Sequence, residues 1–318
     1  MPTKPRRIRA GDTIGVVAPS SPSVYQSDFE RLEQWARSHE FKLKLFPHSR
    51  DRWSYLAGDD QDRAADVTAA FADPEVAAVL AMRGGTGGWR MVPHLDFDVI
   101  KDNPKHFCGY SDITALHLAI GRRADLVTFY GPVGASFIGR SRSKYTERHW
   151  LRVATDPEPL GVVERDPDDP FTWAIQGGAT QGPLRGGCLT LLAQSLGTPW
   201  EVDWHGAIVF FEDVNEEPYR LDGYLTQLKL AGKFDGVAGV VVGEHVNCGP
   251  RPYKPSYAYG TFTSEDVFRQ HLEPLGVPVM VGLPCGHGRH LATLPLGVQA
   301  HLDADALTLE LLEEATTA

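Results

Sequence analysis

The strongest constraint on the fold is a regular alternation of short apolar runs and longer amphipathic segments within residues 11–130. Runs that are apolar or alternating and bounded by turn residues predict β-strands. They lie at 11–19, 42–46, 76–82, 107–108 and 125–130. Segments with apolar residues at helical spacing lie between them, at 25–38, 61–71 and 112–120. Because strand and helix alternate throughout, we expect an α/β fold with a parallel, doubly wound sheet.

Residues 156–181 interrupt this pattern, because they are rich in proline and acidic residues and show little periodicity. We therefore predict an N-terminal α/β domain at 1–155, a linker at 156–181 and a C-terminal α/β domain at 182–318. In the C-terminal domain we expect strands at 207–211, 237–242, 277–282 and 300–311, and helices at 188–196, 219–231 and 264–275. Ser264 is the predicted N-cap of the last helix.

Charge and composition exclude several classes of protein. The chain of 318 residues has a formal net charge of -10, which argues against a nucleic-acid-binding surface. No apolar run approaches the length that a membrane helix requires, so we expect no membrane partner. The 4 cysteines are widely spaced and form no C-x-x-C pair, which is typical of reduced cysteines. The protein is therefore expected in the cytoplasm.

Residues 105–120, KHFCGYSDITALHLAI, place a serine at a turn between a strand and a helix. A hydroxyl at Ser111 would project beside the backbone N–H groups that open the helix, where negative charge is stabilised. An acyl-transferring nucleophile needs this arrangement. The match to the G-x-S-x-G elbow is incomplete, because Ile113 stands in place of its last glycine. Ser111 is thus a candidate nucleophile, with an N-cap or turn serine as the alternative.

Residues 83–90, RGGTGGWR, follow a predicted buried strand. Glycines there allow a close backbone approach or a positive φ. The segment lacks the spacing of a P-loop or of a dinucleotide-binding loop. The alternatives are a plain glycine-rich turn, a phosphate cradle, or an oxyanion hole in which the N–H of Gly85 acts together with that of Asp112.

Residues 210–219, FFEDVNEEPY, place Glu212 directly after a predicted buried strand. Its carboxylate is either an exposed loop group or one that orients a histidine. Glu216 and Glu217 compete for the orienting role, but they lie further along the predicted loop.

Residues 283–297, LPCGHGRHLATLPLG, place His287 between two glycines. With His290 it forms an H-x-x-H pair, which leaves a zinc site as an alternative to a catalytic base. Cys285 and Cys108 are alternative nucleophiles, although packing roles fit them better. Ser111, Glu212 and His287, each on a predicted strand-end loop, together supply a nucleophile, an orienting carboxylate and a base.

The segments GDTIGVVAPS, MRGGTGGWR, GYSDITALH, EDVNEEPYRLD and GHGRHLATLPLG resemble the signature segments of the LD-carboxypeptidases. This family of serine peptidases includes the immunity peptidases that cleave microcin C. The resemblance covers about residues 11–297 and implies a flavodoxin-like N-terminal domain, a mixed C-terminal domain, an active site between them and a homodimer. It implies Ser111 as nucleophile, Glu212 as the acidic member and His287 as base. We expect no cofactor and no metal.

The resemblance also places the oxyanion donors on the backbone of Asp112 and of the Gly84–Gly85 pair. We expect Arg83, Gly84 and Thr86 to contact the substrate. A carboxypeptidase must also bind a terminal carboxylate, for which the candidates are Arg83, Arg90 and Arg185.

The expected function is removal of terminal D-Ala from murein tetrapeptides during cell-wall recycling, with a small peptide as the only partner besides a second subunit. One alternative is hydrolysis of an aminoacyl-nucleotide amide of the microcin type. Candidates for an aromatic platform under its nucleobase are Trp89, Trp200, Tyr253 and Tyr257. A second alternative function is that of a catalytically silent peptide-binding or amino-acid-binding protein. The Pro/Tyr/Gly-rich segment 247–261 is interpreted as a lid or a dimer contact.

Overall fold

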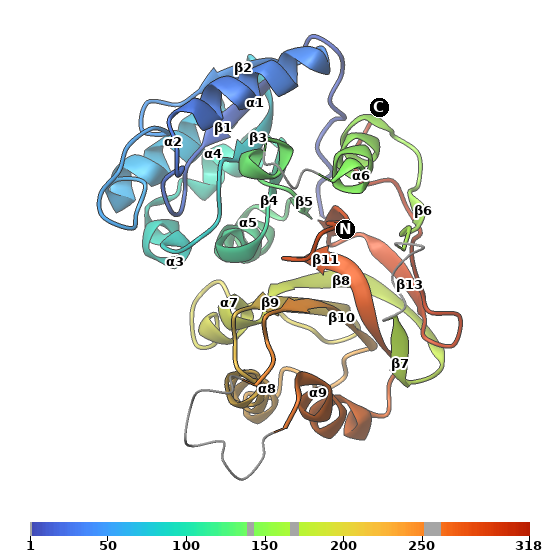
Figure 1. Ribbon diagram of the computed structural model, residues 1–318. Coiled ribbons are helices and arrows are strands. Elements are labelled where there is room, and N and C mark those ends of the chain that lie inside the picture. The colour runs from blue at the N-terminus through green and yellow to red at the C-terminus, as the bar shows by residue number, and fades with distance from the viewer. Residues whose placement is uncertain (1, 139–142, 166–171, 251–261) are drawn as a thin grey trace. The chain divides into compact units, whose positions relative to one another are not determined.

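The computed structural model describes residues 2–138, 143–165, 172–250 and 262–318 (Figure 1). Residues 251–261, with Tyr253 and Tyr257, lie outside this description, so the prediction of a lid or dimer contact at 247–261 falls largely on undescribed residues. The chain forms two compact units. The first comprises Met1–Leu160, Arg289–Val298 and Glu313–Ala318, and the second comprises Gly161–Gly288 and Gln299–Leu312.

A six-stranded sheet forms the centre of the first unit, in the order β12-β5-β4-β3-β1-β2. Its strands are β1 (Thr13–Val17), β2 (Lys42–Leu45), β3 (Val76–Ala81), β4 (His106–Gly109), β5 (Thr128–Tyr130) and β12 (Leu294–Leu296). β1 to β5 are parallel, and only β12 runs antiparallel. The order 2-1-3-4-5 is that of flavodoxin-like folds. The predicted α/β class and doubly wound parallel sheet are therefore confirmed.

Helices surround this sheet because their apolar faces must be buried against it. They are α1 (Ser27–Ser38), α2 (Asp60–Ala72), α3 (Gly88–Met91), α4 (Phe97–Asp102), α5 (Thr114–Ala124) and α6 (Lys144–Thr155), with 3-10 turns η1 (Val92–His94), η2 (Ser111–Ile113) and η3 (Gly134–Phe137). Phe29, Leu32 and Trp35 on α1 are buried at helical spacing. β3 is buried at every position, as expected for a strand covered on both faces.

The second unit contains an eight-stranded mixed sheet in the order β6-β14-β13-β8-β9-β10-β11-β7. Its strands are β6 (Gly161–Val162), β7 (Trp173–Gln176), β8 (Ala179–Cys188), β9 (Ile208–Val214), β10 (Gly239–Val246), β11 (Val279–Gly286), β13 (Gln299–Asp303) and β14 (Thr308–Leu311). The four central strands β8 to β11 are parallel, and the flanking strands pair antiparallel.

Helices α7 (Leu189–Gln194), α8 (Pro218–Leu230) and α9 (Ser264–Leu272) and the 3-10 turn η5 (Glu273–Leu275) complete the described part of this unit. The N-cap of α9 is Thr263, so the prediction of Ser264 is wrong by one residue. Thr263 forms a capping box with Asp266, whose carboxylate accepts a hydrogen bond from the Thr263 N–H at 2.8 Å. The Ser264 hydroxyl instead donates to the carbonyl oxygen of Cys248 at 2.5 Å.

Two segments differ from the expected domain outline. The described part of 156–181, expected as a linker, contributes β6, β7 and the first residues of β8 to the second sheet. Residues 289–298, expected in the C-terminal domain, belong to the first unit and supply its strand β12. Strands β6, β7 and β12 lie at sheet edges, and these segments have little periodicity of their own, so their sequence does not reveal the pairing.

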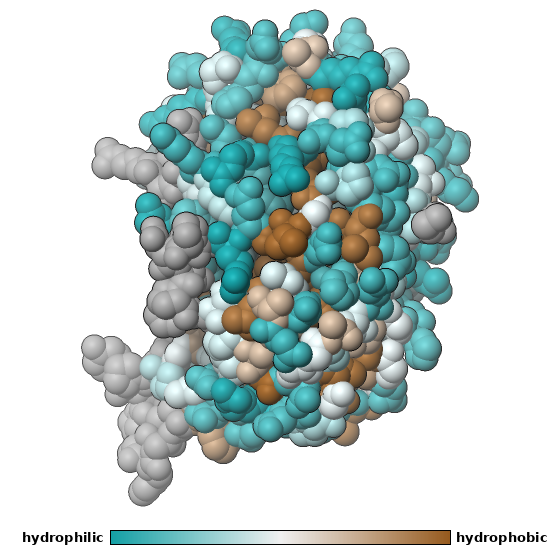
Figure 2. All heavy atoms as spheres, turned by 90° about the vertical axis from the view of Figure 1, so that its right-hand side faces the viewer, coloured by the Kyte–Doolittle hydropathy of each residue, from teal (hydrophilic) through white to brown (hydrophobic). Residues whose placement is uncertain are grey.

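One face of the molecule is mostly polar. The face in Figure 2 is covered largely by hydrophilic residues, and hydrophobic residues form separate small groups on it. Within the described ranges, no helix has both the length and the apolar character needed to cross a membrane.

Candidate active site

In the first unit, candidate residues gather where the parallel strands β1, β3 and β4 end. These strands are neighbours, so the segments that follow them meet at one edge of the sheet. The Ser21 N–H donates to the carbonyl oxygen of Gly84 at 3.3 Å, and the Thr86 N–H donates to Ser21 Oγ at 3.2 Å. The glycine-rich turn at 83–90 is thus joined to the loop after β1.

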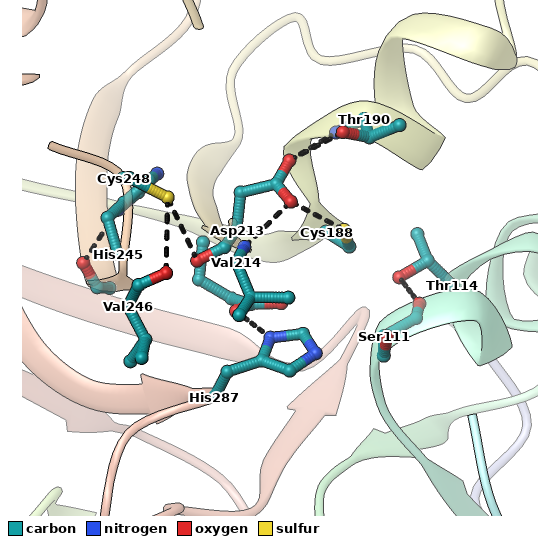
Figure 3. Close-up of polar contacts among 12 residues, drawn as sticks. Ser111, Thr114, Cys188, Thr190, Asp213, Val214, His245, Val246, Cys248 and His287 are labelled. Carbon is teal, nitrogen blue, oxygen red and sulfur yellow. Dashed lines mark hydrogen bonds and ion pairs between the residues drawn. The ribbon is translucent and has the colours of Figure 1, made fainter. Parts of the chain in front are cut away.

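Ser111 occupies the left-handed region, with φ 65°, at the turn after β4. A non-glycine residue there stores backbone strain. Its N–H donates to the Tyr130 hydroxyl at 3.2 Å, and its carbonyl accepts a hydrogen bond from Thr114 Oγ1 at 2.7 Å (Figure 3). The N-caps of η2 and α5 are Tyr110 and Ile113, neither with a side-chain capping bond. Ser111 is therefore a strained turn residue and not an N-cap.

Gly84 and Gly85 lie against this turn and the neighbouring loop. A Cβ added at Gly84 would lie 3.0 Å from Ser111 Cβ and 3.3 Å from Ser111 Oγ. Gly85 has φ 118°, and a Cβ there would collide with the Ser21 hydroxyl. Gly85 therefore requires glycine, and a side chain at Gly84 would press on the Ser111 turn.

The Asp112 side chain takes part in the same edge. Its Oδ2 accepts hydrogen bonds from the Ser20 hydroxyl at 2.5 Å and from the Gly88 N–H at 2.7 Å. Burial raises the pKa of this carboxyl, although the two hydrogen bonds and the charge of Arg63 act in the opposite direction. Sequence reasoning used only the backbone N–H of Asp112 and missed the role of its side chain.

In the second unit, the corresponding edge carries a carboxylate–histidine pair. Glu212 lies within β9 and is fully buried, and His287 directly follows β11. Glu212 Oε2 and His287 Nδ1 are 2.7 Å apart (Figure 3). The prediction that Glu212 follows the strand is off by three residues, because the strand was expected to end at Phe211 and β9 continues to Val214. Glu212 is not an exposed loop residue.

Glycines make room for this pair. Gly286 has φ 111°, and a Cβ there would lie 2.6 Å from Glu212 Cγ. A Cβ at Gly243 would lie 3.0 Å from Glu212 Cβ. On the other side of His287, a Cβ at Gly288 would collide with the carboxylate of Glu244. Glycine at 286 and 288 therefore lets two carboxylates approach the backbone around His287.

The electrostatics of this pair favour a basic imidazole. Burial alone would lower the pKa of His287, but the hydrogen bond with Glu212 and the negative charges of Glu212 and Asp213 raise it above its ordinary value. A carboxylate on Nδ1 also fixes the tautomer and directs Nε2 to the opposite side of the ring. The pair therefore has the geometry of a general base with an orienting carboxylate.

The competing acidic residues have other partners. Glu216 lies 3.6 Å from the Arg220 guanidinium, and Glu217 is the buried N-cap residue of α8. Glu212 is the carboxylate for which a hydrogen bond to His287 is present.

The other candidate residues lie as follows. His290 belongs to the first unit, and its Nδ1 is 2.8 Å from Ser143 Oγ. Among the residues that the structure describes, no group of three or more His, Cys, Asp or Glu is arranged to hold a metal ion. Burial raises the pKa of the Cys108 and Cys285 thiols, which keeps both protonated.

The three arginine candidates differ in their surroundings. Arg83 is half-buried, and its Nη1 lies 3.4 Å from the carbonyl oxygen of Pro22. Arg90 is paired with Asp60 at 2.9 Å. Arg185 lies half-buried on β8 of the second unit.

Sequence reasoning missed several residues at these two edges. Ser20, Ser21 and Tyr130 line the first edge, as their contacts with 84–88 and Ser111 show. In the second unit, Asp213 accepts hydrogen bonds from the Thr190 N–H at 2.9 Å and from its hydroxyl at 2.7 Å (Figure 3). The signal that could have identified them is their position at the carboxyl ends of parallel strands.

The structure therefore brings Ser111, Asp112 and the 84–86 backbone together in the first unit, and Glu212 and His287 together in the second. Such a strained strand-to-helix serine and such a carboxylate-oriented histidine are the parts of an α/β serine hydrolase.

Comparison with known proteins identifies the family. The LD-carboxypeptidase N-terminal domain matches residues 14–131, and the LD-carboxypeptidase C-terminal domain matches residues 181–302. A probable murein peptide carboxypeptidase of Bacillus subtilis is 36% identical over 94% of this chain and 91% of its own length. The chain belongs to the LD-carboxypeptidase family, and it is a hydrolase of the serine carboxypeptidase class.

Two further relatives show the range of the family. The crystal structure of a muramoyltetrapeptide carboxypeptidase from Oxalobacter formigenes has a TM-score of 0.80 and 31% identity, covering 94% of this chain and 97% of that one. The microcin C7 self-immunity protein MccF of Escherichia coli is 26% identical over 96% of this chain and 95% of its own length.

Proposed function

We propose that this protein removes the terminal D-Ala from murein tetrapeptides by hydrolysing an L,D-peptide bond through an acyl-enzyme. The observation that carries the proposal is the buried Glu212 carboxylate on His287 Nδ1, which prepares the imidazole to act as a base. Ser111 is then the nucleophile, His287 the general base and Glu212 the orienting carboxylate.

The reaction begins when His287 Nε2 takes the proton of Ser111 Oγ, and Oγ attacks the carbonyl carbon of the scissile bond. The tetrahedral oxyanion needs donors, and the N–H of Ser111 itself is engaged by the Tyr130 hydroxyl. The N–H groups of Asp112 and Gly85 are the proposed donors, each worth about 3 kcal/mol in comparable sites.

His287 then donates its proton to the leaving amine of D-Ala, which breaks the peptide C–N bond and leaves an ester on Ser111. Water, deprotonated by His287, hydrolyses the ester. Glu212 stabilises the imidazolium in both steps and remains ionised. In this proposal Gly84 and Thr86 contact the substrate, and Arg83, beside the glycine-rich turn, binds the substrate carboxylate.

The relatives support a murein peptide as substrate. The Bacillus subtilis and Oxalobacter formigenes relatives, named for murein peptides, are 36% and 31% identical, whereas MccF is 26% identical. On the same family resemblance, we propose that the protein is a cytoplasmic homodimer. Sedimentation analysis of the purified protein would test the oligomeric state.

Incubation of the pure protein with L-Ala-D-Glu-meso-diaminopimelate-D-Ala tests the proposal. D-Ala should be released, and Ser111→Ala and His287→Ala should each lower kcat by at least about 10⁴-fold. Turnover of an aminoacyl-nucleotide amide in place of the tetrapeptide would identify a microcin-type hydrolase. Tight binding of the peptide with no turnover would identify a binding protein.

A further inference from the structure

The Asp112 carboxylate joins the three loops that carry the candidate residues of the first unit. One of its oxygens, Oδ2, accepts hydrogen bonds from Ser20, on the loop after β1, and from Gly88, on the turn after β3. Asp112 itself follows Ser111 on the turn after β4. A Cβ added at Gly88 would lie 2.8 Å from the Asp112 carbonyl oxygen. The glycine-rich turn is thus packed directly against the Asp112 backbone and side chain.

The Arg63 guanidinium, on helix α2, holds two of these three loops, those that follow β1 and β3. Its side chain is fully buried, and it donates to the carbonyl oxygens of Pro19, of Gly58 at 3.2 Å and of Gly87 at 3.1 Å. Pro19 and Gly87 directly precede the two residues that bond to Asp112. The same guanidinium pairs with the Asp60 carboxylate on α2. A buried guanidinium is costly unless its N–H groups are satisfied, and these four partners satisfy them.

The two proposed oxyanion donors belong to different loops, which gives this network a catalytic consequence. The N–H of Gly85 lies on the turn after β3, and that of Asp112 lies on the turn after β4. An oxyanion hole works only when both donors are held to within about 0.5 Å of the reacting oxygen's position. No strand pairing fixes residues 84–88 to residues 110–112, so this distance depends on the side-chain network.

We propose that Asp112, through its carboxylate, and Arg63, through its guanidinium, are positioning residues that fix the Gly85 N–H relative to the Asp112 N–H. This inference rests on the proposed function, because it concerns donors to the oxyanion of that reaction. Neither side chain touches the substrate. Asp112 bonds the glycine-rich turn to the Ser111 turn, and Arg63 anchors the glycine-rich turn to the loop after β1.

Asp112→Asn tests the role of the carboxylate, because it keeps the shape and removes the charge. It should lower kcat by about 10²-fold with KM nearly unchanged, since a misplaced donor affects the transition state and not substrate binding. Ser20→Ala removes one of the two bonds to Oδ2 and should lower kcat by about tenfold. This milder change keeps the test open if Asp112→Asn does not fold.

Asp28→Asn is the matched control. Asp28 is also a buried aspartate of the first unit, and its Oδ2 accepts a hydrogen bond from the Ser23 hydroxyl at 2.7 Å. It makes no hydrogen bond to residues 84–88 in the described contacts, so its variant should lower the melting temperature without changing kcat.

Arg63→Lys completes a double-mutant cycle. Lysine retains the charge but cannot replace the planar fork that serves three carbonyl groups, so kcat should fall by about tenfold. Because both residues hold the same turn, the effects of Arg63→Lys and Asp112→Asn should be less than additive.

Unchanged kcat in folded Asp112→Asn and Ser20→Ala would overturn the inference, as would equal losses of kcat in Asp28→Asn. Ser111→Ala separates this failure from that of the proposed function. If Ser111→Ala retains activity, the serine mechanism itself is wrong. If Ser111→Ala is inactive and Asp112→Asn is fully active, only the positioning role is wrong.

Discussion

The two sheet edges that carry candidate residues occupy the same topological position but are built by different physical means. In the first unit the edge consists of a strained serine turn, glycines and backbone N–H groups. In the second unit it consists of a fully buried carboxylate and the histidine bonded to it. The carboxyl ends of parallel strands supply the position in both cases. The first edge therefore acts through its backbone, which the buried Asp112 carboxylate holds in place, and the second acts through the charge of a buried carboxylate beside a histidine.

This difference predicts which kind of substitution each edge tolerates. A change of charge that keeps shape should be most damaging in the second unit. A single added methyl group should be damaging in the first unit, where backbone atoms lie in contact with Ser111.

Glu212→Gln should have the largest effect, because it keeps the shape of the side chain and removes the charge that orients His287. We expect kcat to fall by about 10⁴-fold, as the amide favours the wrong imidazole tautomer. Steady-state D-Ala release measures this. The control is Asp222→Asn, which removes an exposed carboxylate 2.7 Å from His271 Nε2 in the same unit. Equal losses of kcat in the two variants would contradict a special role for the Glu212–His287 pair, because the Asp222–His271 pair would then matter as much.

Gly84→Ala tests the dependence of the first edge on backbone geometry. The new Cβ would lie 3.0 Å from Ser111 Cβ and 3.2 Å from the Tyr110 carbonyl oxygen, so the turn must shift by a few tenths of an ångström. We expect kcat to fall by about tenfold.

Gly121→Ala is the control for this methyl group, because it lies in helix α5 with no atom within 4 Å of the new Cβ. It should leave kcat unchanged and stabilise the helix by about 0.5–1 kcal/mol, measurable by urea unfolding. Unaltered turnover in Gly84→Ala would show that the serine turn is more adaptable than its contacts indicate.

The pH dependence should show the electrostatic character of the second edge. As the proposed general base, His287 must be neutral to accept a proton, so kcat/KM should rise with pH through a pKa above the ordinary value of 6.5. In Glu212→Gln, His287 is still buried but loses the negative charge that raises its pKa. The rise of the residual kcat/KM with pH should therefore move to lower pH. If kcat/KM rose at the same pH in the unmodified protein and in Glu212→Gln, this pKa would belong to another group.

The same shift has a consequence for stability. A histidine whose folded pKa is raised binds its proton more tightly in the folded state. This contribution is fully present below pH 6.5 and is lost as the pH rises through the folded pKa. Glu212→Gln should remove that pH-dependent part of the unfolding free energy, as urea titrations on both sides of this range would show.

The smallest effect is expected for the cysteines. Both thiols are buried and protonated, so Cys108→Ser and Cys285→Ser should keep most of the activity, measured as D-Ala release. Loss of turnover in either folded variant would move the nucleophile away from Ser111.

The strands that position the site could be predicted because their signals are local. β1 and β3 are short apolar runs bounded by turn residues, and this pattern is sufficient to locate them. The Glu212–His287 contact could be proposed because each residue stands at the end of such a run. Their actual distance depends on the glycines at 243 and 286, which have meaning only once the strands are paired.

Other features depend on tertiary contacts that no local pattern records. The positive φ of Ser111 is not encoded by the usual glycine or asparagine. The bonds of Asp112 to Ser20 and Gly88 join segments that are distant along the chain. The edge strands β7 and β12 contain too little periodicity to be separated from loops.

Strand β12 has a consequence for synthesis of the protein. It pairs with β5, beside the strand that leads to Ser111, yet it is translated after nearly all of the second unit. Residues 313–318 also return to the first unit, where Lys4 pairs with Glu313 at 2.7 Å. During translation, the β5 edge of the first sheet therefore stays unpaired until β12 has been synthesised. Truncation after residue 160 would leave that edge exposed permanently, so splitting the gene between the two family-matched regions would not yield an independent N-terminal fragment with a complete sheet.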